Sequence, residues 1–166
     1  MNIRGITNAV RARLLTDTGT GGLFNVGTPL VKAAYHEFGP DESDPDFATN
    51  APYIVFRVVA ADQQDGFATD LISYDIEFHV IGLVANGADP LLKAQDRIYG
   101  DAIENADRLP LYGFHRHNLV ETVTGDADAP WAASPGMFHL GFTTAHDGKC
   151  FDYVTTYRVF ASRVKV

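Results

Sequence analysis

The sequence predicts an α+β fold, with a mainly antiparallel sheet of four or more strands, two helices packed on one face, and long loops at 23–52 and 125–150. Residues 71–83 alternate between apolar and polar side chains, which is typical of a strand with one buried face. Residues 89–109 repeat apolar side chains at helical spacing. Further strands follow in sequence, and such an order favours antiparallel pairing with the helices in a second layer.

Length and composition narrow the class of protein. The 166 residues fit one domain, 1–166, and 46% hydrophobic with 20% charged residues is ordinary for a globular core. No apolar run approaches the roughly 20 residues of a membrane helix, and the first residues lack the apolar block of a secretory signal. The single cysteine, Cys150, excludes an intramolecular disulfide and fits a reducing compartment. The formal charge of −8 argues against a protein that grips nucleic acid by its phosphates.

The first element expected along the chain is a short amphipathic helix. Asn2 is placed to cap it, arginines separate its apolar residues, and the glycine-rich stretch 17–22 ends it. The apolar residues at helical spacing are Ile3, Ile6, Val10 and Leu14. Residues 23–52 are rich in acidic residues and proline, which predicts a long solvated loop.

Two strands joined by a hairpin-like segment are expected next. Residues 53–61 form an apolar run interrupted by Arg57, which predicts a strand buried on both faces. One face would pack on the chain's own helices, and the other could pack on a neighbouring subunit. Residues 71–83 form the second strand, and its polar face carries Ser73, Asp75, Glu77 and His79.

The clearest helix signal covers residues 89–109. Asp89 is placed as the N-cap, and Pro90 at the first helical position lacks an N–H that would have no partner there. Pro110 stops the helix. Gly100 costs about 1 kcal/mol relative to alanine inside a helix, and a close approach to the sheet would explain its presence.

Two further strands are expected at about 114–123 and from Phe151 to the C-terminus. The loop between them, 125–150, is unusually rich in large apolar residues: Trp131, Met137, Phe138, Leu140 and Phe142. A loop this apolar predicts a partner contact, with a short strand at 137–143. Large apolar side chains of this kind anchor protein interfaces, so we take Trp131, Met137 and Phe138 as candidate interface residues.

No group of residues predicts catalysis, a metal site or a cofactor. The candidate metal ligands are His115, His117, His139, His146, Asp147 and Cys150, but their spacing matches no metal motif. Cys150 with His146 lacks the signature of a nucleophile pair. The paired acids Asp75 and Glu77 fit a solvated strand face. A phosphate cradle requires a glycine-rich loop that follows a strand, whereas the glycines at 17–22 follow a helix. We therefore expect a non-enzymatic protein that acts through its surfaces.

Four segments together resemble a known family, the tail terminator (tail completion) proteins of long-tailed, siphovirus-like bacteriophages. They are "APYIVFRVV" from Ala51, "YDIEFHVIG" from Tyr74, "LLKAQDRIYGDAIENA" from Leu91 and "YVTTYRVFAS" from Tyr153. The order and spacing of these segments carry the resemblance, which covers residues 2–16 and 50–164. The acidic insertion at 37–51 and the loop at 125–150 are long for the family.

The resemblance implies a structural virion protein. Such proteins form a ring, usually a hexamer, that caps the head-proximal end of the tail tube, ends tube polymerisation and offers the head–tail joining interface. The implied partners are further copies of the chain, the tail tube protein and a head–tail connector or stopper protein, with DNA passing through the lumen. No cofactor and no membrane are implied. The implied location is the virion tail or neck, after assembly in the host cytoplasm.

Within a ring, Arg57 could pair with a carboxylate across the subunit interface. The candidate interface residues are therefore Arg57, Trp131, Met137 and Phe138. Two alternatives stay open. The first is another ring- or tube-forming structural protein, such as a tail tube subunit or head–tail connector. The second is a small ligand-binding or enzymatic α+β domain.

Overall fold

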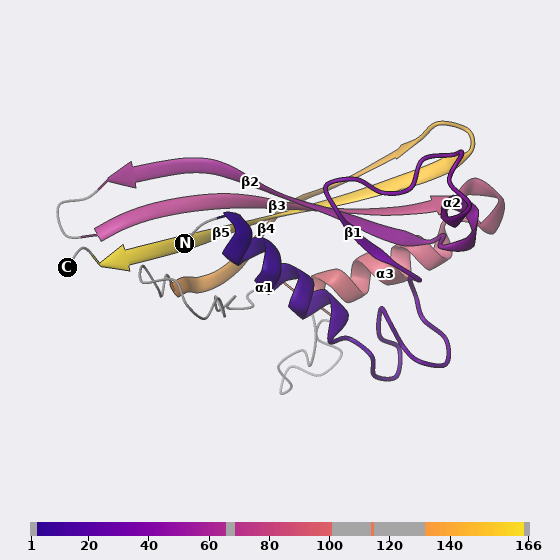
Figure 1. The fold of residues 1–166 in the computed structure, drawn as a ribbon, viewed down its shortest axis with the longest axis horizontal. Helices are drawn as coiled ribbons and strands as arrows, with labels where there is room; N and C mark the ends of the chain where they lie inside the picture. The colour runs from indigo at the N-terminus through magenta and orange to yellow at the C-terminus, as the bar shows by residue number, and fades with distance from the viewer. Residues whose placement is uncertain (1–2, 66–68, 101–113, 115–131, 165–166) are drawn as a thin grey trace.

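The structure is a computed structural model that describes residues 3–65, 69–100, 114 and 132–164. Within these residues the α+β class is confirmed, because helices pack on a five-stranded sheet (Figure 1). Along the chain the elements are α1 (Ile3–Leu15), β1 (Ala34–His36), α2 (Asp46–Thr49), β2 (Tyr53–Asp65), β3 (Thr69–Leu83), η1 (Val84–Asn86), α3 (Asp89–Tyr99), β4 (Ala132–His146) and β5 (Cys150–Val164).

The described sheet is mixed. Its strand order is β1-β2-β3-β5-β4. The β2–β3, β3–β5 and β4–β5 pairs are antiparallel, whereas the three-residue β1 runs parallel to β2. The expected loop at 23–52 therefore contains a short edge strand and the single-turn helix α2.

The short strand expected at 137–143 is confirmed, but it is part of the longer strand β4, Ala132–His146. The expected loop at 125–150 was therefore wrong at 132–136 and 144–146. The register of β4 shifts between Ala133 and Met137, and again between His139 and Gly141. Pro135 and Gly136 lie at the first of these bulges. They resemble loop punctuation in the sequence because a bulge, like a loop, tolerates proline and glycine.

The helix α3 begins at Asp89, one residue before the predicted first residue Pro90, and ends at Tyr99, ten residues before the predicted end. Its N-cap is Ala88, so the prediction of Asp89 as the N-cap was wrong, and Asp89 lies in the first turn. Gly100 follows it with a φ of 112°, a left-handed conformation that favours glycine, so Gly100 terminates the helix. The close approach between helix and sheet lies elsewhere, at Gly82 in β3. A Cβ there would lie 2.6 Å from Cδ1 of Leu91. The predicted strand at 114–123 lies outside the described residues, apart from Phe114.

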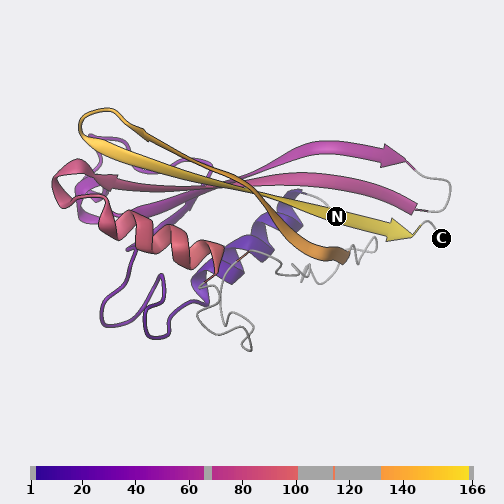
Figure 2. The same ribbon diagram turned by 180° about the vertical axis from the view of Figure 1, so that it is seen from behind.

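One face of the sheet, which we call the helix face, carries the core. Figures 1 and 2 show α1 and α3 on the same side of the sheet. Apolar side chains from both helices and from β2, β3 and β5 form one buried cluster, whose largest fully buried members include Ile6, Leu14, Ile54, Phe56, Ile76, Phe78, Leu91, Ile98, Phe114 and Tyr157. Each strand contributes alternate residues, as the period of a strand requires.

The opposite face is covered at one end by the chain itself. Tyr53 and Val55 are buried in a second, smaller apolar cluster. Tyr53 packs against Tyr35 of β1 and Phe47 of α2, with ring centroids 5.7 and 6.4 Å apart. The expectation that β2 is buried on both faces is therefore met at its start by residues 33–51, rather than by a neighbouring subunit.

Candidate functional site

Beyond that second cluster the same face carries charged side chains and lies open to solvent among the described residues. We call this region the open face and define it by Arg57 of β2, Asp75, Glu77 and His79 of β3, and Asp152 and Arg158 of β5. All six residues share one strand parity in a common register. An antiparallel sheet with one solvated face is expected to place polar side chains there.

A four-residue network crosses the open face from β5 to β2. The carboxylate of Asp152 lies 3.0 Å from Nδ1 of His79, and Nε2 of His79 lies 2.9 Å from Nη2 of Arg57. Arg57 also lies 3.1 Å from the Glu77 carboxylate. Because a guanidinium can only donate, Nε2 of His79 accepts from Arg57 and Nδ1–H donates to Asp152. This geometry fits the neutral imidazole.

The network also perturbs the titration of His79. The hydrogen bond to Asp152 raises the pKa of His79 above its ordinary value of 6.5, against the opposing effects of burial and of the Arg57 charge. Protonation would place a second N–H against the Arg57 guanidinium. Asp152 and His79 resemble a catalytic Asp–His pair. However, the nitrogen that would act as a base, Nε2 of His79, already accepts a hydrogen bond from Arg57.

A second ion pair lies beside this network. Arg158 of β5 donates from Nε and Nη2 to the two carboxylate oxygens of Asp75, at 2.7 and 2.8 Å. This two-pronged geometry is the strongest form of an arginine–carboxylate pair. Asp75 and Glu77 therefore each have their own arginine, and they do not form the proton-sharing carboxylate pair that an acid–base site would need.

Exposed apolar side chains lie on the two side strands β4 and β2, with Phe138 and Val59 on the open face and Phe142, which contacts Tyr153, on the helix face. On β4 they are Phe138, Leu140 and Phe142, with exposed fractions of 40, 50 and 44%, and on β2 Val59 is 50% exposed. Phe138 contacts Phe160 of β5, with ring centroids 6.0 Å apart. Large side chains left in water at a sheet edge are typical of a surface that meets another protein.

The sequence-predicted interface residues have different fates. Arg57 is exposed, but it pairs with Glu77 of its own chain instead of awaiting a carboxylate from a neighbour. Phe138 is exposed on β4, whereas its neighbour Met137 is fully buried in the helix-face core and offers nothing to a partner. Trp131 lies outside the described residues.

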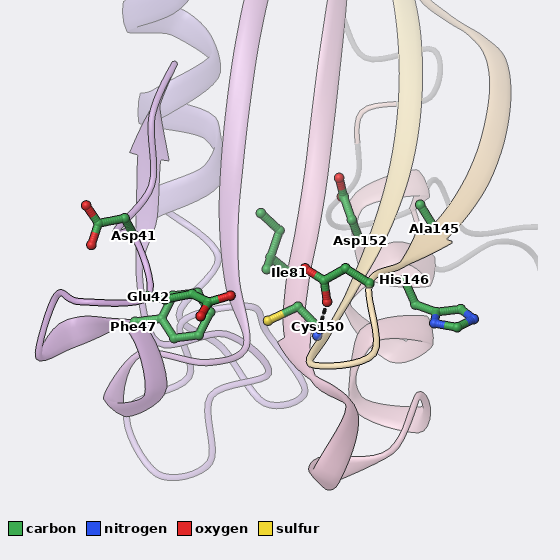
Figure 3. Close-up of a pocket in the computed structure, with 9 residues that line it drawn as sticks. Asp41, Glu42, Phe47, Ile81, Ala145, His146, Cys150 and Asp152 are labelled. Carbon is green, nitrogen blue, oxygen red and sulfur yellow. Dashed lines mark hydrogen bonds between the residues drawn. The ribbon is translucent and has the colours of Figure 1, made fainter.

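A hollow of about 490 Å³ lies between the segment around α2 and the β4–β5 turn. Its lining residues include Asp41, Glu42, Asp147 and Asp152 (Figure 3). These carboxylates already have partners. The Ser43 hydroxyl, followed by backbone N–H groups, donates to Asp41 and lowers its pKa. Backbone N–H groups of Cys150 and Lys149 lower the pKa of Asp147, and Glu42 pairs with Lys149. The hollow therefore presents acids that are engaged in turns and ion pairs.

The hollow contains no activated nucleophile. Burial raises the pKa of the Cys150 thiol, and the nearby carboxylates raise it further, which disfavours the reactive thiolate. Figure 3 shows His146 pointing away from the Cys150 sulfur. In the part of the chain that the structure describes, no three His, Cys, Asp or Glu side chains gather as a metal ion would require. His115 and His117 lie outside that part.

Sequence reasoning placed the open-face residues of β3 on one face, but it missed Asp152, Arg158 and all the pairings of the open face. Asp75, Glu77 and His79 were placed on one strand face, and Asp152 and Arg158 also share parity in the last strand. Which residues meet depends on the register of β3 against β5, where Asp75 lies opposite Arg158 and His79 opposite Val154. Periodicity within one strand does not contain that information.

The sequence matches no model of a known protein family and no curated protein. Among the described residues, no helix is both long and apolar enough to cross a membrane. The candidate function therefore depends on the fold, the open face and the sheet edges.

Proposed function

We propose that the chain is the tail terminator subunit of a long-tailed bacteriophage. In this role it is a structural protein without catalytic activity. Copies form a ring on the head-proximal end of the tail tube, end tube polymerisation and provide the interface for the head. Its partners are other copies, the tail tube protein and a connector or stopper protein.

The observation that carries the proposal is a sheet whose side edges have no strand partner among the described residues. Strands of 13 to 15 residues extend beyond α1 and α3 (Figure 1). Exposed apolar residues lie on the strands near both edges of the sheet, β2 and β4. The four segments that carry the family resemblance fall mainly, in their described parts, on β2, β3, α3 and β5, in that order. Such a subunit fits assembly into a larger structure better than solitary function.

The charges support a protein that lets DNA pass without holding it. The chain carries a formal charge of −8, and both arginines that define the open face are paired with carboxylates of the same chain. Binding to DNA depends chiefly on unpaired cations that displace counterions from phosphates. A ring with this charge would repel DNA during transit rather than trap it.

Deletion of the gene from its particle genome tests the proposal. We expect electron micrographs of the lysate to show DNA-filled heads separate from tails, with abnormally long tubes, because repeated tube contacts continue until something caps them. Supplying the intact gene in trans should restore joined particles.

Other outcomes identify other functions. A lysate without any tubes would point to a tube subunit. Joined particles with tails of uniform length would overturn the proposal, and an infection defect in such normal particles would point to the enzymatic alternative.

A further inference from the structure

Two edges of the described sheet have no strand partner. On one side β1 pairs with β2 through residues 54–56 and then stops, so the edge of β2 from Arg57 to Asp65 is left without a strand neighbour among the described residues. On the other side β4 is the last strand described. Unpaired strand edges are templates for pairing with another chain unless they are blocked.

The edge of β4 lacks the charges that usually block such pairing. Residues 132–146 contain no Asp, Glu, Lys or Arg. Pro135 removes one backbone donor at the first bulge, and the second bulge follows His139. The stretch between the bulges displays Phe138, and Leu140 and Phe142 follow it, all exposed. In the part of the chain that the structure describes, this edge is therefore unpaired, and it is apolar where natural monomers place lysine or other charges.

The β2 and β4 edges are antiparallel to each other, and their exposed apolar residues lie at the same position along the strand direction. β2 is antiparallel to β3, β3 to β5, and β5 to β4, so β2 and β4 run in opposite directions. The cross-strand partners Val59–Asp75, Asp75–Arg158 and Arg158–Phe138 form one row across the sheet. Val59 and Phe138 thus lie at the two ends of the same row, on the same face, and both are exposed.

A second copy set beside the first at the same level would bring β4 of one chain against β2 of the next, antiparallel. The bulge in β4 favours this level. Gly141 lies in the row of Thr156, Glu77 and Arg57, so β4 bends at the level where β1 stops covering β2. The part of β4 before the bulge faces the part of β2 that is uncovered.

We propose that copies of this chain join head to tail by pairing the β4 edge of one copy with the β2 edge of the next, with Phe138 packed against Val59. The contact deepens the proposed function, on which it rests for its biological role. It continues one sheet from subunit to subunit through a single type of heterologous contact, and such a contact produces a closed ring when its rotation closes.

Charge favours this contact over two copies meeting through their β2 edges. A β2–β2 pairing would bring Asp62 and Asp65 of both chains to one seam, and like charges on paired strands destabilise a sheet. A β4 edge adds no acidic residue to that seam. A β4–β4 pairing would leave every β2 edge open, whereas the head-to-tail contact covers both edges at once.

Cysteine cross-linking of the purified full chain tests the contact. All variants carry Cys150→Ala, so that the native thiol is absent. Val59→Cys and Phe138→Cys are made separately, and Val26→Cys, which replaces a residue that is 93% exposed in the loop after α1, serves as the collision control. Each variant alone, and each mixture of two, is oxidised at low salt and at about 1 M salt, where charge repulsion is screened. Dimers are counted on non-reducing gels, and their linked residues are identified by mass spectrometry.

The mixture of Val59→Cys with Phe138→Cys is expected to form dimers about tenfold faster or more than either variant alone, because an oriented contact raises the effective concentration of the two thiols. Leu140→Cys replaces Phe138→Cys if the latter lowers the folded fraction. If the Phe138→Cys variant alone forms dimers fastest, the proposal is replaced by a two-fold contact between two β4 edges. If the Val59→Cys variant alone forms dimers fastest, it is replaced by a two-fold contact between two β2 edges. Rates equal to the Val26→Cys control would overturn any edge contact. None of these results changes tube length in the deletion lysate, so the two proposals fail separately.

Discussion

Phe78 and His79 are adjacent in β3, yet they serve opposite faces of the same sheet. Phe78 is fully buried and packs against Phe114 and Tyr157, with ring centroids 4.7 and 5.8 Å away. His79 faces the other way and joins Asp152 to Arg57. Side-chain direction reverses at each residue of a strand, so one segment of sequence builds a core and a charged surface together.

The two faces differ in how their interactions are made. The helix face excludes water, and its stability comes from apolar area and close packing. The open face leaves its charges partly in water, where an ion pair contributes little to folding. The comparison teaches that the helix face fixes the fold, whereas the open face can change its charge state without loss of the fold.

The sharpest test of this comparison replaces the two neighbours in β3. Phe78→Ala should lower the free energy of unfolding by about 3–5 kcal/mol, because it removes a buried ring and leaves a cavity. His79→Ala should cost about 1 kcal/mol at neutral pH, the usual value of a partly exposed hydrogen-bonded group. Urea unfolding followed by circular dichroism measures both. Equal losses would contradict the division of labour between the faces.

A second test compares ion pairs instead of single residues. Asp17 is buried, accepts from Arg97 of α3 at 2.6 and 2.8 Å, and also accepts from the Leu23 backbone N–H. Asp17→Ala should therefore cost about 3–5 kcal/mol, because it leaves a guanidinium largely buried without its carboxylate.

The matched variant on the open face is Asp75→Ala, which breaks the pair with Arg158. Both side chains are partly exposed, so the expected loss is about 1 kcal/mol or less. The same unfolding measurement applies to both variants. A larger loss of unfolding free energy for Asp75→Ala than for Asp17→Ala would show that the ion pair of the open face contributes more to stability than the buried ion pair.

A third test uses pH to act on the open face alone. The hydrogen bond to Asp152 raises the pKa of His79 above 6.5 in the folded chain. A raised pKa means that the folded state binds the proton more tightly, so the added stability is full below pH 6.5 and is lost as pH rises through the folded pKa. Other groups also titrate, so the comparison needs a variant without the Asp152 carboxylate, which accepts this charge-assisted hydrogen bond.

Asp152→Asn supplies that variant. The difference in unfolding free energy between the native chain and Asp152→Asn should be largest near pH 5.5 and should shrink as pH rises above 6.5. Urea titrations at several pH values measure it. A difference that grows with pH would show that Arg57 and burial, which oppose the shift, dominate the titration of His79.

Much of the fold could be predicted because its signals are local. The alternation of 71–83 predicted β3 and its two faces, and helical spacing predicted α1 and the start of α3. The end of α3 was missed because Gly100 is compatible with either a helix interior or a helix end, and only its φ of 112° decides between them. β4 was predicted only at 137–143, because its bulges interrupt the alternation that identifies a strand.

The candidate site could be predicted only in part, because its contacts are non-local. Arg57 was singled out, but its partner was sought in another subunit instead of in Glu77 on the next strand. Met137 and Phe138 looked equivalent in the sequence, since both are large and apolar in a segment with loop signals. Placing that segment in the sheet separates them, because consecutive residues of a strand face opposite ways.

That separation gives the last test, which compares the two neighbours Met137 and Phe138. Met137 is fully buried, whereas Phe138 is 40% exposed and contacts Phe160. Met137→Ala should cost about 2–5 kcal/mol through the cavity it leaves. Phe138→Ala should cost about 0.5–1.5 kcal/mol, the typical value of one aromatic pair.

Self-association should show the reverse order of effects among folded molecules, with the larger loss for Phe138→Ala. If Phe138 packs against Val59 of the next copy, its loss should weaken self-association by about 2 kcal/mol or more, as interface anchors do. Thermal unfolding measures the first quantity, and light scattering across a salt series measures the second. A Phe138→Ala chain that associates as readily as the native chain would remove β4 from the interface, whatever its melting temperature.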